Sequence, residues 1–467
     1  MKIALAQLNY HVGNFESNTA KIIDHIEKAR QNGADLVVFS ELFVCGYPAR
    51  DFLEFKEFIS QCEEAAKNIA AACTGIACII GLPIPNHKAE GKDLNNSAYF
   101  IEDGKIKAIV NKALLPNYDI FDEYRYFEPS TEFSCIEFKG HRIALTICED
   151  LWNDIENPLY VTRPMDILIK QQPDVMINIA ASPFAYNHDE ERIAILKDNA
   201  SRYNLPLFYV NHVGAQTEII FDGGSLVFDN TGKLVDELPY FEESLAYYTL
   251  SKDSTITLNQ PSTVKPQRET DIEQIHQALI LGIRDYFSKS GFSRAILGLS
   301  GGIDSAVVCA LAAEALGAEN VMAVLLPSKF SSDHSLKDAE DLVKNLGCKH
   351  EIIAIKHITD AFEAALHPQF NNLPFNIAEE NIQSRSRAIV LMAMCNKFGY
   401  ILLNTSNKSE AAVGYGTLYG DMCGGISVIG DVYKTQVFEL ARHINRNQEI
   451  IPENSIIKPP SAELRPD

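Results

Sequence analysis

The sequence predicts an α/β protein of two domains, and three features of its pattern support this. Strand-like and helix-like segments alternate through residues 1–250, as expected for sheets that are covered by helices. A polar stretch with two prolines follows over residues 251–270 and is typical of a linker. From residue 271 a β-α-β rhythm indicates a parallel, doubly wound sheet. We therefore expect domains over residues 1–250 and 271–467.

In the first domain, strands are expected where short apolar runs end at turn residues, and helices where apolar residues recur every three or four positions. The expected strands cover residues 2–8, 35–40, 76–81, 142–147, 175–181 and 206–211. The expected helices cover residues 18–32, 52–72 and 190–203. Turn residues at 102–105 and 229–232 predict two hairpins. Two layers of strands between helices account for this order.

In the second domain, helices and strands alternate regularly. The expected helices cover residues 271–288, 306–316 and 336–346. The expected strands cover residues 294–299, 321–326 and 351–355. A doubly wound sheet binds its ligands at the carboxyl ends of its strands, so we expect the site of this domain there.

Composition narrows the class of protein. A chain of 467 residues is too long for one core, and its 46% hydrophobic and 22% charged residues are typical of a globular protein. The net charge of −21 argues against binding to nucleic acid or to an anionic membrane. No apolar run approaches the roughly 20 residues that span a bilayer. Ten cysteines without paired spacing indicate a reducing compartment, and Met1 leads directly into an expected strand, so we expect a cytoplasmic protein.

A loop of small residues lies between the expected strand at 294–299 and the helix at 306–316. Its sequence is Gly298-Leu299-Ser300-Gly301-Gly302-Ile303-Asp304-Ser305. Backbone N–H groups of such a loop, together with the helix N-terminus, favour a bound phosphate. No Gly-Lys-Ser/Thr follows, so it is not a Walker loop, and a glycine-rich turn in an ordinary β-α unit is the alternative. The motif resembles the pyrophosphate loop of the N-type ATP pyrophosphatases, which cleave ATP to AMP and pyrophosphate as they activate a carboxylate or carbonyl.

Three reactive side chains in the first domain each follow an expected strand. Glu41 lies in an apolar setting, Lys112 follows a hairpin, and Cys148 stands where a strand turns toward a helix. At such a turn we expect helix-end N–H groups to lower the pKa of the thiol. A carboxylate can take the thiol proton and return it to a leaving amine, while an ammonium group stabilises an oxyanion. Taken singly, each residue also fits a structural role.

Together these three contexts resemble the nitrilase, or carbon–nitrogen hydrolase, superfamily across residues 1–250. The resemblance implies an α-β-β-α sandwich and a catalytic triad of Glu41, Lys112 and Cys148. Runs at residues 121–127 and 181–184 match the branch that uses glutamine. That branch implies glutamine contacts at Tyr118, Glu149, Ser182 and His188. His188 stands where the family commonly has lysine or arginine, so its contact is expected to be weaker.

Further motifs in the second domain complete the set expected for a nucleotide site. Asp304 and Glu410 carry carboxylates suited to Mg2+, and Lys434 offers a point charge for phosphate. Residues 414–421 combine glycines, tyrosines and a carboxylate, which suits a stacked ring and ribose hydroxyls. Arg385 and Arg387 lie among polar donors, although Arg385 fits a helix surface equally well.

This set is similar to the NAD synthetase domain over residues 270–467, which implies a Rossmann-like fold of the adenine nucleotide alpha hydrolase kind. The implied ATP contacts are residues 298–305 and Thr405, with Mg2+ held by Asp304 and Glu410. The implied deamido-NAD contacts are Asn381, Arg387, Glu410, Tyr415, Asp421 and Lys434. The family also implies a mobile loop from residue 459 and a helical tail, which we expect to be missing from this sequence. Its dinucleotide sites lie at a two-fold interface, so we expect a homo-oligomer, at least a dimer.

Joined in one chain, the two domains resemble the glutamine-dependent NAD+ synthetases. The resemblance implies that L-glutamine supplies ammonia at Cys148, and that ammonia then amidates deamido-NAD at the cost of ATP. Three alternatives stay open: another glutamine-fed amidoligase such as a GMP synthetase, a metabolite sensor without chemistry, and a plain amidase with an accessory nucleotide domain. The formation of NAD+, AMP and pyrophosphate would distinguish a glutamine-dependent NAD+ synthetase from all three alternatives.

Overall fold

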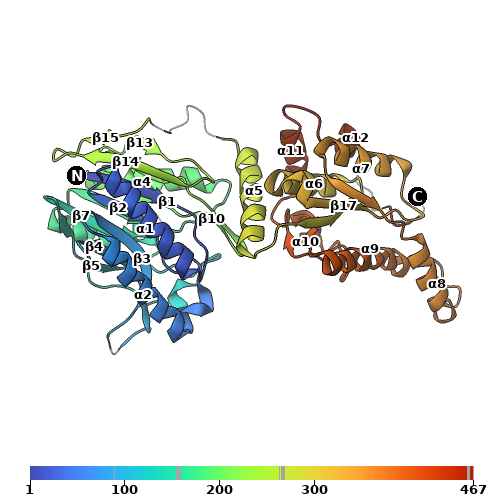
Figure 1. Cartoon of the computed structure of the whole chain (residues 1–467), viewed down its shortest axis with the longest axis horizontal. Helices are drawn as coiled ribbons and strands as arrows, with labels where there is room; N and C mark the ends of the chain where they lie inside the picture. The colour runs from blue at the N-terminus through green and yellow to red at the C-terminus, as the bar shows by residue number, and fades with distance from the viewer. Residues whose placement is uncertain (89, 154–158, 262, 264–268, 460–462, 466–467) are drawn as a thin grey trace. The chain divides into compact units, whose positions relative to one another are not determined.

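The computed structural model describes residues 1–467 except 89, 154–158, 262, 264–268, 460–462 and 466–467 (Figure 1). The chain divides into two compact units, Met1–Arg268 and Glu269–Asp467, and each has its own hydrophobic cores. Among the described residues, none of the helices combines the length and apolar character that crossing a membrane requires. All ten cysteines lie in the described part of the chain and are free thiols.

The first unit contains two large sheets. The seven-stranded sheet has the order β15 (Ile256–Leu258), β14 (Ser244–Leu250), β1 (Lys2–Gln7), β2 (Leu36–Phe39), β3 (Ala77–Pro85), β4 (Leu94–Glu102) and β5 (Lys105–Asn111). The six-stranded sheet has the order β13 (Leu234–Glu237), β12 (Leu226–Phe228), β9 (Leu207–Val210), β8 (Val175–Ile179), β7 (His141–Ile147) and β6 (Ile136–Phe138). A separate hairpin joins β10 (Val213–Gln216) to β11 (Ile219–Asp222).

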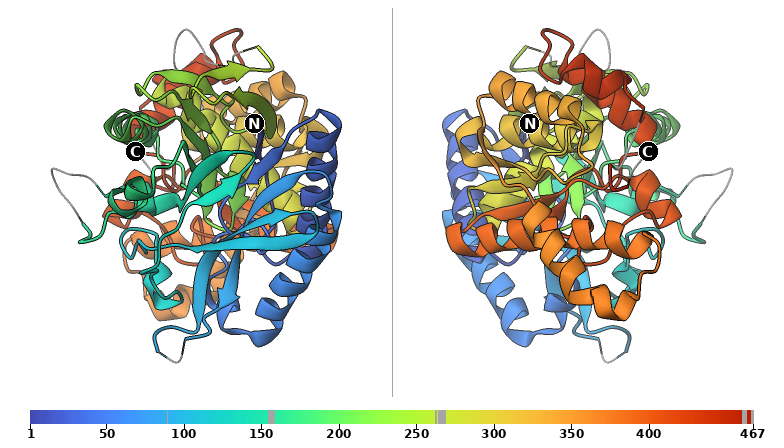
Figure 2. Two further views of the ribbon diagram at one scale, coloured as in Figure 1. Left: turned by 90° about the vertical axis from the view of Figure 1, so that its left-hand side faces the viewer. Right: turned by 90° about the vertical axis from the view of Figure 1, so that its right-hand side faces the viewer.

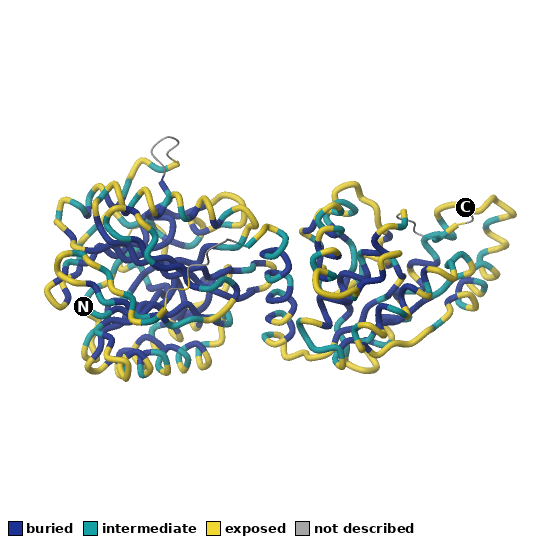
Figure 3. The backbone as a smooth tube through the Cα atoms, turned by 90° about the horizontal axis from the view of Figure 1, so that it is seen from above, coloured by how far each residue is buried: buried dark blue, intermediate teal, exposed yellow. Residues whose placement is uncertain are grey.

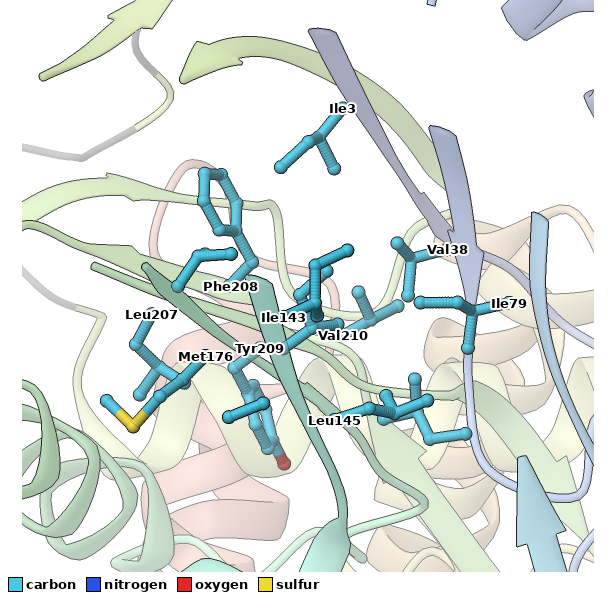
Figure 4. Packing of buried hydrophobic residues seen from close by; sticks show 14 of the residues in the cluster. Ile3, Val38, Ile79, Ile143, Leu145, Met176, Leu207, Phe208, Tyr209 and Val210 are labelled. Carbon is cyan, nitrogen blue, oxygen red and sulfur yellow. The ribbon is translucent and has the colours of Figure 1, made fainter. Parts of the chain in front are cut away.

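The two sheets pack face to face through alternate residues of strands that are buried on both faces. Val38 and Ile79 of the seven-stranded sheet face Ile143 and Val210 of the six-stranded sheet, and all four are fully buried (Figure 4). Side chains of a strand point alternately to its two faces, so the residues between these line the outer face of each sheet. This double layer forms the middle of the unit.

Helices cover both outer faces of the double layer. One sheet is covered by α1 (Phe15–Gln31) and α2 (Lys56–Ala72), whose apolar faces form a second core with the outer residues of β1 and β2. The other is covered by α3 (Pro164–Leu168) and α4 (His188–Tyr203). Figure 2 shows the blue helices on one side of the paired sheets and green α4 on the other. The expected α-β-β-α sandwich is confirmed.

The second unit has one parallel sheet. Its order is β18 (Lys349–Ile352), β17 (Val321–Leu325), β16 (Ala295–Gly298), β19 (Ile401–Asn404) and β20 (Ile426–Ser427). One face is covered by α5 (Asp271–Lys289), α6 (Ile303–Leu316), α7 (Asp333–Leu346), α11 (Lys434–Ile444) and α12 (Glu453–Ile457). The other face is covered by α9 (Ile377–Phe398), beside which lies α8 (Lys356–Phe370). The short helix α10 (Lys408–Val413) follows β19.

The expected doubly wound sheet is confirmed, and its strand order reverses between β16 and β19. Neighbouring residues of one strand face opposite cores, as Ile296 and Leu297 of β16 do. In Figure 3 the inner segments of the tube are mostly dark blue, whereas the outer sides of the coils are yellow. Because chain segments leave β16 and β19 in opposite directions, a crevice for ligands is expected beyond their carboxyl ends.

Three elements differ from the sequence prediction. The stretch predicted as a linker from residue 251 contains β15, which pairs with β14, so the first unit extends to Arg268. The helix predicted over residues 52–72 is interrupted at Phe55, where the short 3-10 helix η1 (Arg50–Glu54) ends before α2 begins. Helix α6 begins at Ile303, three residues earlier than predicted, which places Asp304 in its first turn. These boundaries were missed because edge strands and helix starts contain polar residues, whereas the prediction relied on the spacing of apolar residues.

Candidate active sites

Lys112 is the centre of a buried cluster of charges in the first unit. It follows β5 directly, is fully buried, and its Nζ lies 2.7 Å from Oε1 of Glu41 and 2.8 Å from Oε1 of Glu123. Glu41, in the turn after β2, is 1% exposed. Burial by itself lowers the pKa of Lys112, but the two carboxylates outweigh it and raise that pKa well above the ordinary value. Lys112 is therefore held as an ammonium ion.

Cys148 stands where β7 ends and the short 3-10 helix η3 (Cys148–Leu151) begins. Its φ of +43° is a left-handed conformation that residues with side chains seldom adopt, and it turns the chain sharply. The prediction of a lowered thiol pKa is wrong. Burial and the charge of Glu41 raise the pKa of Cys148 well above the ordinary value, although Lys112 opposes them. The resting side chain is a thiol whose proton a neighbouring carboxylate can take.

Glu41 is fixed by neutral donors as well as by Lys112. The side-chain amide of Asn96 donates to Oε1 of Glu41 over 2.6 Å, and the backbone N–H of Ala181 donates to Oε2 over 3.1 Å. These donors come from β4 and from the segment after β8, so both sheets contribute to the position of this carboxylate. The structure thus brings the three residues of the predicted triad into one buried cluster.

Glu123 is a second carboxylate at Lys112 to which the sequence assigned no role. It begins the 3-10 helix η2 (Glu123–Arg125), and its Oε1 also accepts a hydrogen bond of 2.9 Å from the hydroxyl of Tyr47. Burial raises its pKa to about 7, against the opposing charge of Lys112. The signal that points to it is a carboxylate set among aromatic residues at 121–127, the run that matched the glutamine-using branch.

Tyr118 and Glu149, both predicted to contact glutamine, lie together beside Cys148. The Tyr118 hydroxyl donates to both carboxylate oxygens of Glu149, over 2.9 and 3.1 Å. Tyr160, which the sequence did not indicate, donates to Oε1 of the same carboxylate over 3.0 Å. Glu149 is 4% exposed, and burial raises its pKa. Two hydroxyl donors therefore orient a buried carboxylate that can accept a substrate ammonium group.

Ser182 and His188 are the other two predicted glutamine contacts. Ser182 is held by Asn211, whose side chain accepts from the Ser182 N–H over 2.8 Å and donates to its carbonyl over 3.1 Å. His188 stacks on Trp152 with 4.9 Å between ring centroids, and burial lowers its pKa. Trp152 directly follows η3. Ser182 thus lies next to the Ala181 donor of Glu41, whereas the ring of His188 contacts Trp152 at the end of η3.

The predicted phosphate loop of the second unit runs from the end of β16 to the start of α6. Gly298 ends the strand, while Leu299 and Ile303 are buried and anchor the two ends of the loop. Gly302 is the N-cap of α6, and the following turn presents backbone N–H groups that lack partners within the helix. The loop therefore has the strand, turn and helix order that the sequence predicts for anion binding.

Gly301 explains why this loop needs small residues. Its φ is +79°, and a Cβ added there would lie 2.1 Å from the carbonyl oxygen of Ser335. The loop is closed from within, because the Ser300 N–H donates to Oγ of Ser305 over 3.2 Å and their hydroxyls lie 3.1 Å apart. A side chain at position 301 would force the loop away from α7.

Asp304 and Glu410 meet at the reversal of the strand order, in the first turns of α6 and α10. Asn407 links them: its side chain donates to Oδ1 of Asp304 over 2.9 Å, and its N–H donates to Oε2 of Glu410 over 3.1 Å. Lys434, the first residue of α11, forms an ion pair with Oδ2 of Asp304. Burial and the charge of Asp304 contribute to raising the pKa of Glu410. The sequence did not indicate Asn407 for this role.

This donor set fits Mg2+ in kind. Within the described residues no group of three or more histidine, cysteine or carboxylate side chains is arranged to hold a metal. Mg2+, however, is commonly bound by one or two carboxylates together with substrate phosphates and water. Asp304 and Glu410 supply the two carboxylates beside the glycine-rich loop, so the fit requires phosphates from a bound nucleotide.

The predicted dinucleotide residues lie around a loop that packs on α9. Asn381 accepts a hydrogen bond of 2.9 Å from the Thr417 hydroxyl, and Oδ1 of Asp421 accepts one of 2.6 Å from the Thr417 N–H. The Asp421 N–H in turn donates to the hydroxyl of Ser384 over 2.9 Å. Asn381 and Asp421 are therefore brought together by Thr417, a residue that the sequence did not indicate.

The remaining predicted contacts differ in how firmly they are held. Arg387 donates from Nε to the carbonyl of Leu326 at the end of β17, and burial lowers its pKa to about 10. Thr405 is half-buried and directly follows β19. Tyr415 is 62% exposed, with its N–H bonded to the carbonyl of Glu410. The ring of Tyr415 is thus available for a stacked ligand.

Part of the predicted loop from residue 459 lies outside the described residues, namely 460–462. Next to them, Glu463 accepts hydrogen bonds from the hydroxyls of Ser332 and Ser335, over 2.8 and 2.7 Å. These serines begin α7, which borders the glycine-rich loop at Gly301. A described residue of the C-terminal segment therefore reaches the phosphate side of this unit.

The two arrangements support different chemistry. The first unit combines a buried thiol, a carboxylate able to accept its proton and a fixed ammonium ion, which suits acyl transfer through a thioester. The second combines an anion-binding loop with two carboxylates and a lysine, which suits reactions at nucleotide phosphates. Each arrangement lies within a single unit.

Both parts of the chain match known protein families. Residues 2–260 match the family described as carbon-nitrogen hydrolase, and residues 275–467 match the family described as NAD synthase. The chain is 47% identical to the glutamine-dependent NAD(+) synthetase of Synechocystis sp., over 99% of this chain and 84% of that protein. It is 40% identical to the one of Acinetobacter baylyi, over 100% of this chain and 84% of that protein.

A solved structure agrees with these sequence matches. The glutamine-dependent NAD+ synthetase from Acinetobacter baumannii, in complex with adenosine diphosphate, superimposes with a TM-score of 0.91 at 38% identity. The match covers 99% of this chain and 85% of that one. A second synthetase of this name, from Cytophaga hutchinsonii, has a TM-score of 0.84 at 23% identity and supports the fold.

Proposed function

The chain belongs to the family of glutamine-dependent NAD+ synthetases, and from this premise we propose how its two units divide the reaction. The enzyme is a ligase that converts deamido-NAD, ATP and ammonia to NAD+, AMP and pyrophosphate, with L-glutamine as the source of ammonia. One observation carries the division of labour: a buried Glu–Lys–Cys cluster and a glycine-rich phosphate loop occupy separate units of one chain.

In the first unit, Cys148 is the nucleophile toward the side-chain amide of glutamine. As its sulfur forms a bond to the amide carbon, its proton passes to Glu41, and the Lys112 ammonium stabilises the developing oxyanion. Glu41 then returns the proton to the departing nitrogen, so ammonia leaves and a glutamyl thioester remains. Water hydrolyses the thioester to glutamate and restores the thiol.

Glutamine recognition in the first unit is assigned to four side chains: Tyr118, Glu149, Ser182 and His188. Glu149 faces the glutamine ammonium group because it is a buried carboxylate oriented by two tyrosine hydroxyls. Ser182 is placed by Asn211 next to the backbone donor of Glu41. His188 has the smallest share, since its ring is already stacked on Trp152.

In the second unit, the loop of residues 298–305 holds the ATP phosphates, with Thr405 beside it at the end of β19. Asn381, Arg387, Glu410, Tyr415, Asp421 and Lys434 bind deamido-NAD. The nicotinic acid carboxylate attacks the α-phosphate of ATP and pyrophosphate leaves; ammonia then attacks the adenylate carbonyl and AMP leaves. Bound at Asp304 and Glu410, Mg2+ would neutralise charge on the phosphates.

We also propose that the enzyme is at least a dimer and works in the cytoplasm. Helix α9 leaves Ile389 and Met392, about one turn apart, exposed by 57 and 40%, and neighbouring apolar side chains of this kind are commonly covered by a partner. The ten free thiols fit a reducing compartment. Sedimentation of the active enzyme as a monomer would contradict the first proposal, and its recovery from an oxidising compartment would contradict the second.

The decisive experiment supplies the protein with glutamine, ATP, Mg2+ and deamido-NAD. We expect NAD+, AMP and pyrophosphate in equal amounts, and no NAD+ when deamido-NAD is omitted. An ammonium salt in place of glutamine should sustain the synthesis. Glutamine hydrolysis without any aminated product would contradict the proposal, because it would reduce the protein to an amidase.

A further inference from the structure

Asp150 lies two residues after Cys148 and takes no part in the chemistry described above. Its carboxylate is 5% exposed and accepts three backbone hydrogen bonds. Oδ1 accepts from Ala113 over 3.0 Å and from Leu114 over 2.9 Å, and Oδ2 accepts from Ile147 over 3.0 Å. We propose that Asp150 is a positioning residue that fixes the nucleophile Cys148 relative to the Lys112 ammonium, an inference that rests on the function proposed above.

The three bonds tie together the two residues whose separation matters for catalysis. Ala113 and Leu114 directly follow Lys112, beyond β5 of the seven-stranded sheet. Ile147 directly precedes Cys148, at the end of β7 in the six-stranded sheet. One carboxylate therefore connects the two sheets where each delivers a member of the triad. Glu41, on the same sheet as Lys112, is already bound to it and needs no further link.

The three backbone hydrogen bonds at position 150 require a carboxylate. An ionised carboxylate has acceptor sites on both oxygens and can receive all three N–H groups, whereas an amide of the same shape presents an NH2 group on one side. An asparagine at position 150 would therefore set a donor against at least one backbone donor. Burial raises the pKa of Asp150 to about 6, while the N–H groups of Ile147 and Leu114 oppose that rise. The three hydrogen bonds of the Asp150 carboxylate do not involve the thiol of Cys148.

A positioning role predicts a selective loss of rate. Displacing Cys148 from Lys112 by a fraction of an ångström misaligns the oxyanion and its stabilising charge but leaves Glu149 and Tyr118 able to bind glutamine. The turnover of glutamine should fall while its KM stays the same. The second unit carries its own site, so synthesis from ammonia should be unaffected. A role in stability alone would instead lower the fraction of folded protein and leave the turnover of the folded enzyme unchanged.

The test compares Asp150→Asn with wild type in the full-length enzyme. We expect kcat for glutamine hydrolysis to fall about 100-fold, with an unchanged KM and unchanged NAD+ synthesis from an ammonium salt. Alkylation of Cys148 by a glutamine-mimicking diazo ketone should slow in parallel. Asp236→Asn is the matched control: Asp236 is a buried carboxylate of the same unit that accepts hydrogen bonds from Tyr248 and Thr263. We expect it to retain kcat.

Asp150→Ser is a second variant, because it leaves room for water to receive the freed N–H groups and is expected to fold. The proposal is overturned if a folded Asp150 variant hydrolyses glutamine at the wild-type rate, or if hydrolysis and ammonia-driven synthesis fall together. It is also overturned if both variants fail to fold while Asp236→Asn folds, because Asp150 would then determine folding. Failure of the proposed function looks different: wild type and Cys148→Ala would hydrolyse glutamine equally.

Discussion

The two sites of this chain differ in how complete they are before any substrate binds. In the first unit, Glu41 and Lys112 are 1% and 0% exposed and already paired at 2.7 Å. In the second, Tyr415 is 62% exposed, and Asp304 is paired with Lys434, a cation that phosphates would compete for. The first site is built by folding, whereas the second is completed by its ligands.

This difference follows from the size and charge of the substrates. Glutamine is small, so a sealed pocket can hold its reacting amide in a medium of low polarity, where a fixed ammonium stabilises an oxyanion strongly. ATP and a dinucleotide are large and carry several negative charges. A site for them needs an open edge of a sheet, backbone donors and cations that can exchange partners. In the first unit the cost of burying charge is met by pairing within a fully buried cluster. In the second unit the paired side chains of Asp304 and Lys434 stay partly exposed, at 20 and 25%.

The largest effect is expected from Cys148→Ala, which separates the two sites functionally. Glutamine-dependent NAD+ formation should fall by at least about 10⁴-fold, because the nucleophile is lost. NAD+ formation from an ammonium salt should continue, because the second unit is intact. Both rates are measured by NAD+ release at saturating ATP.

The control for this variant is Cys135→Ala, which removes a half-buried thiol of the same unit that donates to the carbonyl of Leu168. It should retain both activities. Loss of ammonia-driven synthesis in a folded Cys148→Ala protein would show that the sites are not independent.

The second effect concerns the open site. Asp304→Asn keeps the shape of the side chain and removes its charge, so it should lower the rate of NAD+ synthesis by about 10² to 10³-fold and change substrate affinity far less. Glutamine hydrolysis in the first unit should persist. Asp341→Asn, at a surface carboxylate paired with Lys337, provides the control. Synthesis from ammonia at the normal rate in Asp304→Asn would refute the metal assignment.

The third prediction uses the raised pKa of the Cys148 thiol. A raised pKa means that less thiolate is present at neutral pH, so a neutral reagent such as iodoacetamide should react slowly there. The rate should rise about tenfold per pH unit and show no plateau below the ordinary thiol pKa of 9.0. Mass spectrometry of the Cys148 peptide measures it. A plateau near neutral pH would mean that the ammonium of Lys112 outweighs burial and Glu41.

Much of this comparison was available from the sequence because it depends on local patterns. Glu41, Lys112 and Cys148 each follow a strand, and apolar runs identify those strands. These runs and the family resemblance were enough to predict the triad. The glycine-rich loop was equally readable, because strand, small residues and helix are contiguous. The reversal of strand order that brings Asp304 to Glu410 follows from the β-α-β rhythm.

What the sequence could not give are contacts between distant segments and the effects of burial. Glu123 and Asp150 are ordinary carboxylates until folding buries them against Lys112 and against two backbone turns. The thiol pKa was predicted in the wrong direction because the helix-end effect is local and visible, whereas desolvation depends on everything packed around the sulfur. Likewise, β15 was hidden in a polar stretch because an edge strand need not be apolar.

The smallest effect tests how the sealed site recognises glutamine. Tyr118→Phe removes the hydroxyl that donates to both oxygens of Glu149 but leaves the Tyr160 hydroxyl on Oε1. Because one of two orienting donors remains, we expect KM for glutamine to rise about 10-fold, the lower end of the effect of a hydrogen bond to a charged group. The kcat for glutamine and the ammonia-driven rate should not change.

Tyr203→Phe is the matched control for this variant, since the Tyr203 hydroxyl donates to Asp166 over 2.7 Å on an exposed part of the same unit. If Glu149 receives the substrate ammonium group, Tyr118→Phe should also discriminate less between glutamine and glutaramate, which lacks that group. A change in kcat with an unaltered preference would mean that Tyr118 acts on the reacting amide instead. The first site would then recognise glutamine at its reacting amide rather than at its ammonium group.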